Sequence, residues 1–175
     1  MKIIVIYTSG TGFTERYARW IAEELGCEAV PLKSAGPALL QQYDGVIYGG
    51  WVMAGKISGL DKLKKMKAMR GKRLAVFAVG ATPADSEEVI GWICAQNLTE
   101  GEQAVVPFFY FEGGFNFDRM GFVKRKMINM MRSSLQKRPE LSSSDVQMMR
   151  RMKGNYDGSS REFIEPLVSW TKEIK

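Results

Sequence analysis

The stretch Met1-Lys-Ile-Ile-Val-Ile-Tyr-Thr-Ser-Gly-Thr-Gly-Phe-Thr-Glu15 decides the fold. Its apolar run from Ile3 to Tyr7 is uninterrupted and mostly β-branched, which is typical of a strand buried on both faces of a parallel sheet. The run ends at a turn rich in hydroxyl groups and glycine, residues 8–14. An amphipathic helix is then predicted, because apolar residues recur every four positions at Phe13, Tyr17, Ile21 and Leu25.

The loop between this strand and helix has the features of an anion site. The first N–H groups of a helix are free of internal partners and lie at the positive end of its dipole. Glycines let the backbone approach a ligand, and hydroxyl groups add hydrogen bonds. Because no Lys or Arg lies in the loop, we predict a small anion held by neutral donors at Ser9, Gly10, Thr11, Gly12, Phe13 and Thr14.

Two common phosphate-binding motifs do not fit this loop. A P-loop requires a lysine after its last glycine, and the loop has none. A dinucleotide fingerprint requires a third small residue where Glu15 stands. It also requires an acidic residue about 20 positions further on, where the chain has Leu32 and Lys33. A plain Gly/Ser/Thr turn between strand and helix is the remaining structural alternative.

The composition limits the possible chemistry. With 175 residues the chain has the size of one domain with its own core, and we predict a single domain over residues 1–175. No apolar run is long enough to span a membrane, and the chain begins with a strand rather than a signal peptide. The absence of histidine excludes His-containing zinc sites and triads with a His base, so chemistry is expected to come from a cofactor.

The net charge of +6 is concentrated in one segment. Residues 119–138 carry seven basic side chains and no acidic one, which leaves a charge of −1 for the rest of the chain. They belong to a basic, Met-rich segment, residues 115–158, for which we predict helices. We expect residues 115–138 to contact a partner, with peripheral binding to a membrane as one form of that contact. The alternative is an ordinary amphipathic helix packed on its own sheet.

Four more apolar runs alternate with helical patterns along the chain. We predict strands at residues 28–33, 44–50, 73–79 and 104–111, and helices at 62–70, 85–96 and 163–174. This alternation predicts an α/β fold, a doubly wound five-stranded parallel sheet of order 2-1-3-4-5 with helices on both faces. Ligands in such folds bind beyond the carboxyl ends of the strands, so the loops after strands one, three and four should converge.

The second and third of these loops complete the candidate site. They contribute Gly50, Trp51, Val52, Met53, Ala54, Gly55 and Lys56 after strand three, and Gly80, Ala81, Thr82 and Pro83 after strand four. Trp51 offers an aromatic face to a flat ligand, and Val52 or Met53 is the alternative contact. Lys56 would favour negative charge on such a ligand. The tryptophans on helical stripes, at positions 20, 92 and 170, are expected in the core or partly buried.

The segment Ser9-Gly-Thr-Gly-Phe-Thr-Glu15 resembles the FMN-phosphate loop of flavodoxins, Ser/Thr-x-Thr-Gly-x-Thr-Glu. Within the flavodoxin-domain family, the chain is similar to the menaquinone-dependent protoporphyrinogen oxidases. That similarity rests on Tyr43-Asp-Gly-Val-Ile-Tyr-Gly-Gly-Trp-Val-Met-Ala-Gly-Lys56, on Phe111-Glu-Gly-Gly-Phe-Asn-Phe-Asp-Arg119 and on a closing Trp-containing helix. It differs from those oxidases in residues 80–103, which are short and mildly acidic. The resemblance implies a flavodoxin-like fold and non-covalent FMN.

Three classes of function follow from the resemblance. The first is an FMN oxidoreductase that passes electrons between a reduced donor and a quinone or similar acceptor. The second is a soluble electron carrier of flavodoxin type, and the third is a flavin-free binding or regulatory module on the same fold. We expect a redox partner protein or a membrane quinone, no nucleic acid and no metal. We expect a cytoplasmic location, with peripheral contact at the inner face of the membrane if residues 115–138 bind it.

Overall fold

The computed structural model describes residues 1–174, apart from the side chain of Ser144. Five parallel strands form the central sheet in the order β2-β1-β3-β5-β6. They are β1 (Ile3–Thr8), β2 (Glu28–Pro31), β3 (Gly45–Met53), β5 (Arg73–Gly80) and β6 (Phe108–Glu112). A short strand, β4 (Lys56–Ile57), pairs antiparallel with the end of β3. Since β5 and β6 are the fourth and fifth parallel strands, the predicted order 2-1-3-4-5 is confirmed.

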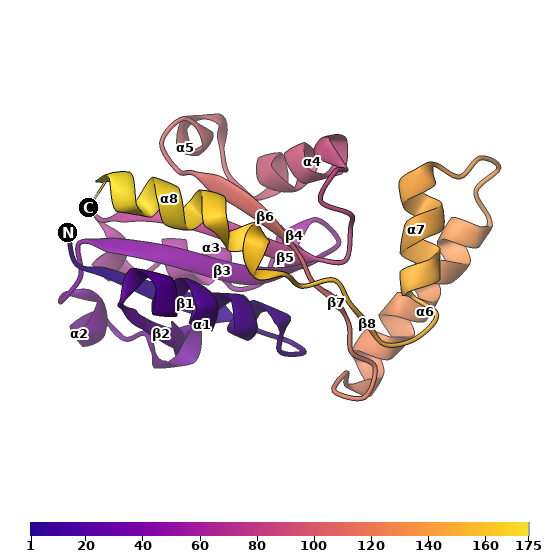
Figure 1. The fold of residues 1–175 in the computed structure, drawn as a ribbon, viewed down its shortest axis with the longest axis horizontal. Coiled ribbons are helices and arrows are strands. Elements are labelled where there is room, and N and C mark those ends of the chain that lie inside the picture. The colour runs from indigo at the N-terminus through magenta and orange to yellow at the C-terminus, as the bar shows by residue number, and fades with distance from the viewer. Residues whose placement is uncertain (175) are drawn as a thin grey trace.

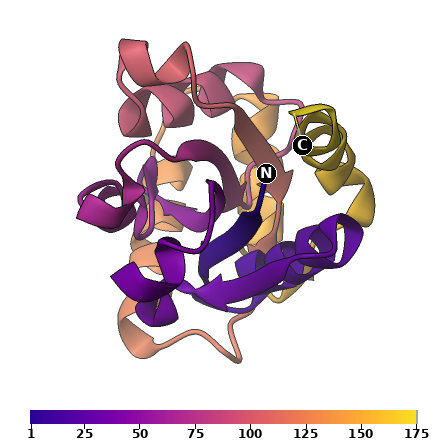
Figure 2. The ribbon, with the colours of Figure 1, turned by 90° about the vertical axis from the view of Figure 1, so that its left-hand side faces the viewer.

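Helices cover both faces of the sheet (Figure 2). The core on one face contains residues of α1 (Phe13–Leu25) and α8 (Glu165–Ile174), which follows the 3₁₀ turn η3 (Arg161–Ile164). The elements on the opposite face are η1 (Leu32–Ser34), α2 (Pro37–Leu40), α3 (Leu60–Lys64), η2 (Lys67–Met69) and α4 (Glu87–Asn97). With both faces covered, Ile4, Val5 and Ile6 of β1 are fully buried, as the apolar run predicts.

Several predicted elements differ in the structure. The strand predicted at residues 28–33 ends at Pro31, because the chain turns into η1 at Leu32. The helix predicted at residues 62–70 is divided into α3 and η2, because Met66 between them has an extended backbone. The strand predicted at residues 104–111 begins only at Phe108. A capping box between Thr99 and Glu102 starts a separate helix, α5 (Glu100–Gln103), and takes Ala104 out of the strand.

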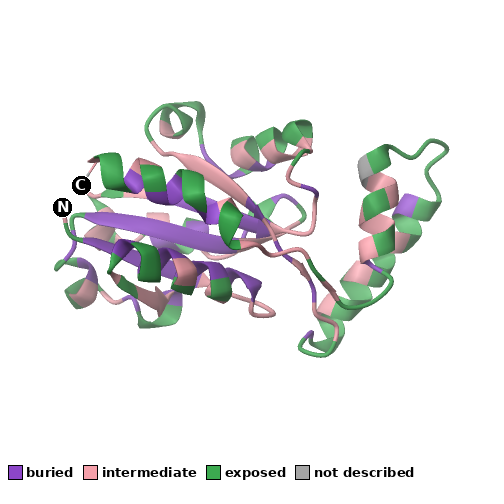
Figure 3. Ribbon diagram, in the orientation of Figure 1, coloured by how far each residue is buried: buried purple, intermediate pink, exposed green. Residues whose placement is uncertain are grey.

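The basic, Met-rich segment forms a helical hairpin beyond the carboxyl ends of the strands (Figure 1). The hairpin consists of α6 (Phe122–Gln136) and α7 (Ser143–Arg151). A two-stranded antiparallel ribbon of β7 (Gly114–Phe115) and β8 (Tyr156–Asp157) connects it to the sheet. Phe115, Met120, Leu135 and Met152 give it a small buried core of its own. Most of its remaining surface is exposed or half-buried, in contrast to the buried strands (Figure 3).

Candidate functional site

A cavity of about 620 Å³ lies between the strand ends and the hairpin. Cofactor sites commonly have volumes of about 300–1,000 Å³. The loops after β1, β3 and β5 form its walls, so the three predicted loops do converge. The predicted residues that line it are Gly10, Thr11, Phe13, Thr14, Trp51, Val52, Met53, Ala54, Gly55, Gly80, Ala81 and Thr82.

The other predicted site residues lie behind or beside the cavity wall. Ser9 supports the first loop, because its Oγ accepts a hydrogen bond from the Gly12 N–H at 3.1 Å. Gly50 packs against β4, and Pro83 is buried behind its loop. Lys56 donates a hydrogen bond from Nζ to the Gln96 carbonyl oxygen of α4. The structure therefore does not support the expected contact of Lys56 with a ligand in the cavity.

The loop after β1 has an unsatisfied buried hydroxyl. Thr14 in the first turn of α1 is 1% exposed, and no group in the described part of the chain hydrogen-bonds to its Oγ1. A buried polar group without a partner costs free energy, so a ligand acceptor at this point would be stabilising. Gly12, just before the helix, has a φ of 107°, which favours glycine. The hydroxyl, the loop and the helix N-terminus together fit a phosphate group.

Two basic side chains that the sequence analysis did not assign approach this loop from the hairpin. A β-carbon placed on Gly12 would lie 3.0 Å from Arg119 Nη1, and one placed on Gly10 would lie 2.9 Å from Lys124 Nζ. Lys124 Nζ also lies 4.4 Å from the centre of the Trp51 ring. The loop therefore has two basic side chains beside it, in addition to the neutral donors predicted from the sequence. The only sequence signal for these residues is the charge excess of residues 119–138.

The hairpin roofs the cavity with flexible apolar side chains. Those of Met120, Met127, Ile128, Met131, Leu135 and Met148 line it. Trp92 of α4, expected in the core or partly buried, is 50% exposed and stands at the cavity wall. A β-carbon on Gly55 would lie 2.3 Å from its ring, so the loop after β3 passes close under this tryptophan. The cavity thus combines a polar end at the first loop with an apolar roof.

The comparison with protein families identifies the fold family. The family model for the flavodoxin domain matches residues 4–142 of the sequence. The chain belongs to the flavodoxin domain family. No curated protein matches it in the corresponding comparison.

Several solved structures are similar to this flavodoxin domain. A flavodoxin from the domain Archaea has 14% identity and a TM-score of 0.45, over 68% of this chain and 88% of that chain. Oxidised flavodoxin 1 from Bacillus cereus has 21% identity and a TM-score of 0.42, over 68% and 89%. The flavodoxin, WrbA-like protein from Agrobacterium tumefaciens has 16% identity and a TM-score of 0.45, over 99% and 98%.

Two polar side chains stabilise the cavity loops of this flavodoxin domain. Asn97 is buried, and its amide accepts a hydrogen bond from Ile57 N at 2.9 Å and donates one to Gly55 O at 2.6 Å. Tyr110 donates a hydrogen bond to the Thr82 carbonyl oxygen at 3.0 Å. Burial raises the pKa of Tyr110, so its hydroxyl stays protonated and remains a donor even in alkaline solution. The hydrogen bonds of Asn97 and Tyr110 therefore hold the loops after β3 and β5 in place.

An ion pair fixes the hairpin over the cavity. Arg151, the last residue of α7, lies 3.1 Å from a carboxylate oxygen of Glu112 at the end of β6. The two side chains are only 13% and 14% exposed. Arg151 also donates a hydrogen bond to the Ala81 carbonyl oxygen at 2.8 Å, and Glu112 accepts one from Ala84 N at 2.7 Å. The pair thus joins α7 to the loop after β5 and the end of β6.

Proposed function

We propose that this chain binds FMN non-covalently in the cavity and transfers electrons between a reduced donor and a quinone or similar small acceptor. The observation that carries the FMN assignment is the buried, unpartnered Thr14 hydroxyl at the N-terminus of α1. Gly10, Thr11 and Thr14 would hold the phosphate, and Trp51 would contact the flat ring. Bound there, FMN would supply one- and two-electron redox chemistry that the histidine-free chain lacks.

The roof of the cavity favours a small acceptor over a partner protein. α6 and α7 cover the end of the sheet, and a protein docked on the outside of α6 would be separated from the cavity by the thickness of a helix, about 10 Å. Methionine side chains adapt to irregular apolar ligands. A small apolar molecule that enters beneath Met127, Met131 and Met148 would reach the ring directly.

Reoxidation kinetics test this function. The FMN-loaded protein is reduced anaerobically and mixed with a water-soluble menaquinone analogue. Its reduction by a flavodoxin reductase is measured in parallel. We expect fast reoxidation by the quinone analogue and slow reduction by the reductase, because the roof admits small molecules more readily than proteins. Fast exchange with the reductase and none with the quinone would instead identify a soluble electron carrier.

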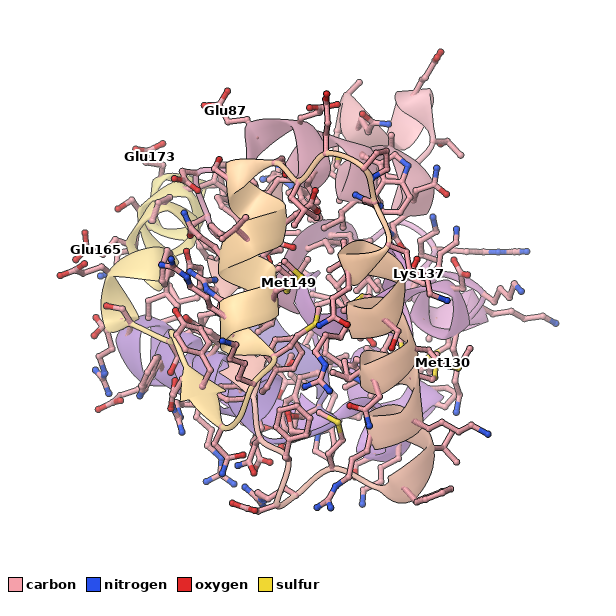
Figure 4. The ribbon with its side chains drawn as sticks, turned by 90° about the vertical axis from the view of Figure 1, so that its right-hand side faces the viewer. Glu87, Met130, Lys137, Met149, Glu165 and Glu173 are labelled. Carbon is pink, nitrogen blue, oxygen red and sulfur yellow. The ribbon has the colours of Figure 1, made fainter. Side chains whose placement is uncertain are left out.

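The outer face of α6 supports a second part of the proposal, peripheral contact with an anionic membrane. Phe122, Val123 and Met130 are 81%, 69% and 64% exposed. A surface groove combines Phe122 and Met130 with the basic residues Arg125, Lys126 and Lys137; Figure 4 labels Met130 and Lys137 on α6. Within residues 1–174, no helix has the length and apolar character needed to cross a membrane. An apolar face flanked by basic residues fits a helix lying on a lipid surface.

Reversing two charges on this face should abolish most vesicle binding. Each basic residue near an anionic membrane contributes about 1 kcal/mol, so Lys126→Glu with Lys137→Glu should weaken binding by about 30-fold or more. Co-sedimentation with anionic and neutral vesicles at low and high salt measures the effect. Lys33→Glu with Lys172→Glu, two exposed sites away from the hairpin, makes the same charge change as a control. Equally weak binding of the unmodified protein to both kinds of vesicle would contradict the membrane contact.

A further inference from the structure

We propose that Arg119 and Lys124 form a cationic clamp on the phosphate of FMN, so that the cofactor ties the helical hairpin to the loop after β1. This inference rests on the proposed FMN site. It adds to that site two residues that lie outside the phosphate-loop motif and more than 100 positions further along the chain. It also gives the hairpin a role in holding the cofactor as well as in roofing the cavity.

The two cations flank the phosphate loop. Lys124 lines the main cavity together with Gly10 and Thr14. Arg119 lines an adjacent hollow of about 460 Å³ together with Gly12. Thr11 and Phe13 line both spaces, so the two spaces adjoin at this loop and the start of α1. A phosphate bound at the start of α1 would have one cation on each side.

Neither clamp residue is paired with a carboxylate in the described part of the chain, whereas the other arginines near the loop are. Arg16 lies 2.6 Å from Asp157, and Arg19 lies 2.6 Å from Glu15. No carboxylate within residues 1–174 pairs with Arg119 or Lys124. Two unpaired cations beside a neutral loop repel each other, and a phosphate dianion between them would replace that repulsion with two charge-assisted contacts.

The clamp couples cofactor binding to the hairpin. Lys124 lies in the first turn of α6, and Arg119 lies in the connection that precedes this helix. A ligand that bridges the loop and these residues stabilises the position of the hairpin over the cavity. The stabilisation equals the free energy of the added contacts. Riboflavin has the same ring system as FMN but no phosphate. It should therefore occupy the cavity without stabilising the hairpin through the clamp.

Flavin titrations of charge-neutralised variants test the clamp. The variants are Arg119→Gln, Lys124→Gln and the double substitution, with Lys153→Gln, at an exposed position just after α7, as the matched control. Quenching of flavin fluorescence measures the affinities for FMN and riboflavin. Each single substitution should weaken FMN binding about ten-fold or more and leave riboflavin binding unchanged. The control should bind both flavins like the unmodified protein.

Hydrogen exchange provides a readout that is independent of activity. FMN should slow amide exchange in α6 of the unmodified protein more than riboflavin does at equal saturation, and the double variant should lose this difference. Equal losses of FMN and riboflavin affinity would overturn the clamp, as would an equal effect of Lys153→Gln. If inorganic phosphate alone slowed exchange in α6 as much as FMN does, Arg119 and Lys124 would form a site for free phosphate. That result would also overturn the clamp on FMN. Failure of the unmodified protein to bind either flavin would instead reject the proposed function.

Discussion

Replacing Gly114 with alanine should detach the hairpin from the sheet and lower the free energy of unfolding by about 3 kcal/mol or more. A β-carbon at this position would lie 1.9 Å from the Tyr156 carbonyl oxygen and 3.0 Å from Phe13 Cζ. The carbonyl belongs to the backbone of β8, which pairs with β7 through Gly114 and Phe115. The clash cannot be relieved by a side-chain rotation, so the two strands must separate.

Urea unfolding and hydrogen exchange measure this effect. Exchange should become fast in α6 and α7, while β1 and β3 retain their protection, because these strands belong to a separate core. Gly154→Ala is the control, since its β-carbon would have no heavy atom within 4 Å. If the Gly114 and Gly154 variants were equally stable, the ribbon would not be the connection that holds the hairpin.

Replacing Arg151 with methionine should lower the free energy of unfolding by nearly as much. The substitution leaves the Glu112 carboxylate without its cation in a site where it is only 14% exposed. It also removes the donor to the Ala81 carbonyl oxygen. Breaking a buried ion pair by removing one partner typically costs about 3–5 kcal/mol. We expect the lower end of this range, because both side chains keep some contact with solvent.

A double-mutant cycle separates the ion pair from general effects at the end of α7. Arg150→Met changes the neighbouring exposed arginine in the same way and should leave the midpoint of urea unfolding nearly unchanged. The double variant Arg151→Met with Glu112→Leu should recover part of the stability that Arg151→Met loses, because no unpaired charge then remains. If Arg151→Met were as mild as Arg150→Met, the ion pair would not fix the hairpin.

The sheet could be predicted because its signals are local. The apolar run Ile3–Tyr7 has the composition of a central parallel strand, and the structure buries it on both faces. The turn that follows and the four-residue repeat of α1 lie next to it in the sequence. Alternation of further strands and helices left few arrangements other than the doubly wound sheet. The convergence of the three loops follows directly from that topology.

The position of the hairpin could not be predicted, because its contacts are distant in sequence. Periodicity indicated helices within residues 115–158, but not where they would pack. Composition and periodicity left open whether residues 115–138 pack on the sheet or contact a partner. In the structure, α6 divides its apolar residues between two environments: Met127 and Met131 line the cavity, while Val123 and Met130 are exposed. The contact of Arg151 with Ala81 spans 70 residues, so no local pattern could indicate it.

An equilibrium FMN titration of the protein and its Thr14→Val variant tests whether the Thr14 hydroxyl binds the phosphate of FMN. We expect saturable binding of FMN by the protein and about ten- to a hundred-fold weaker binding by the variant, because one hydrogen bond to a charged phosphate is lost. Thr171→Val in α8 serves as the control, since its buried hydroxyl donates a hydrogen bond to the Leu167 carbonyl oxygen, outside the cavity. No FMN binding by the unmodified protein, or equal affinity in the Thr14 variant, would contradict the assignment of this cavity to FMN.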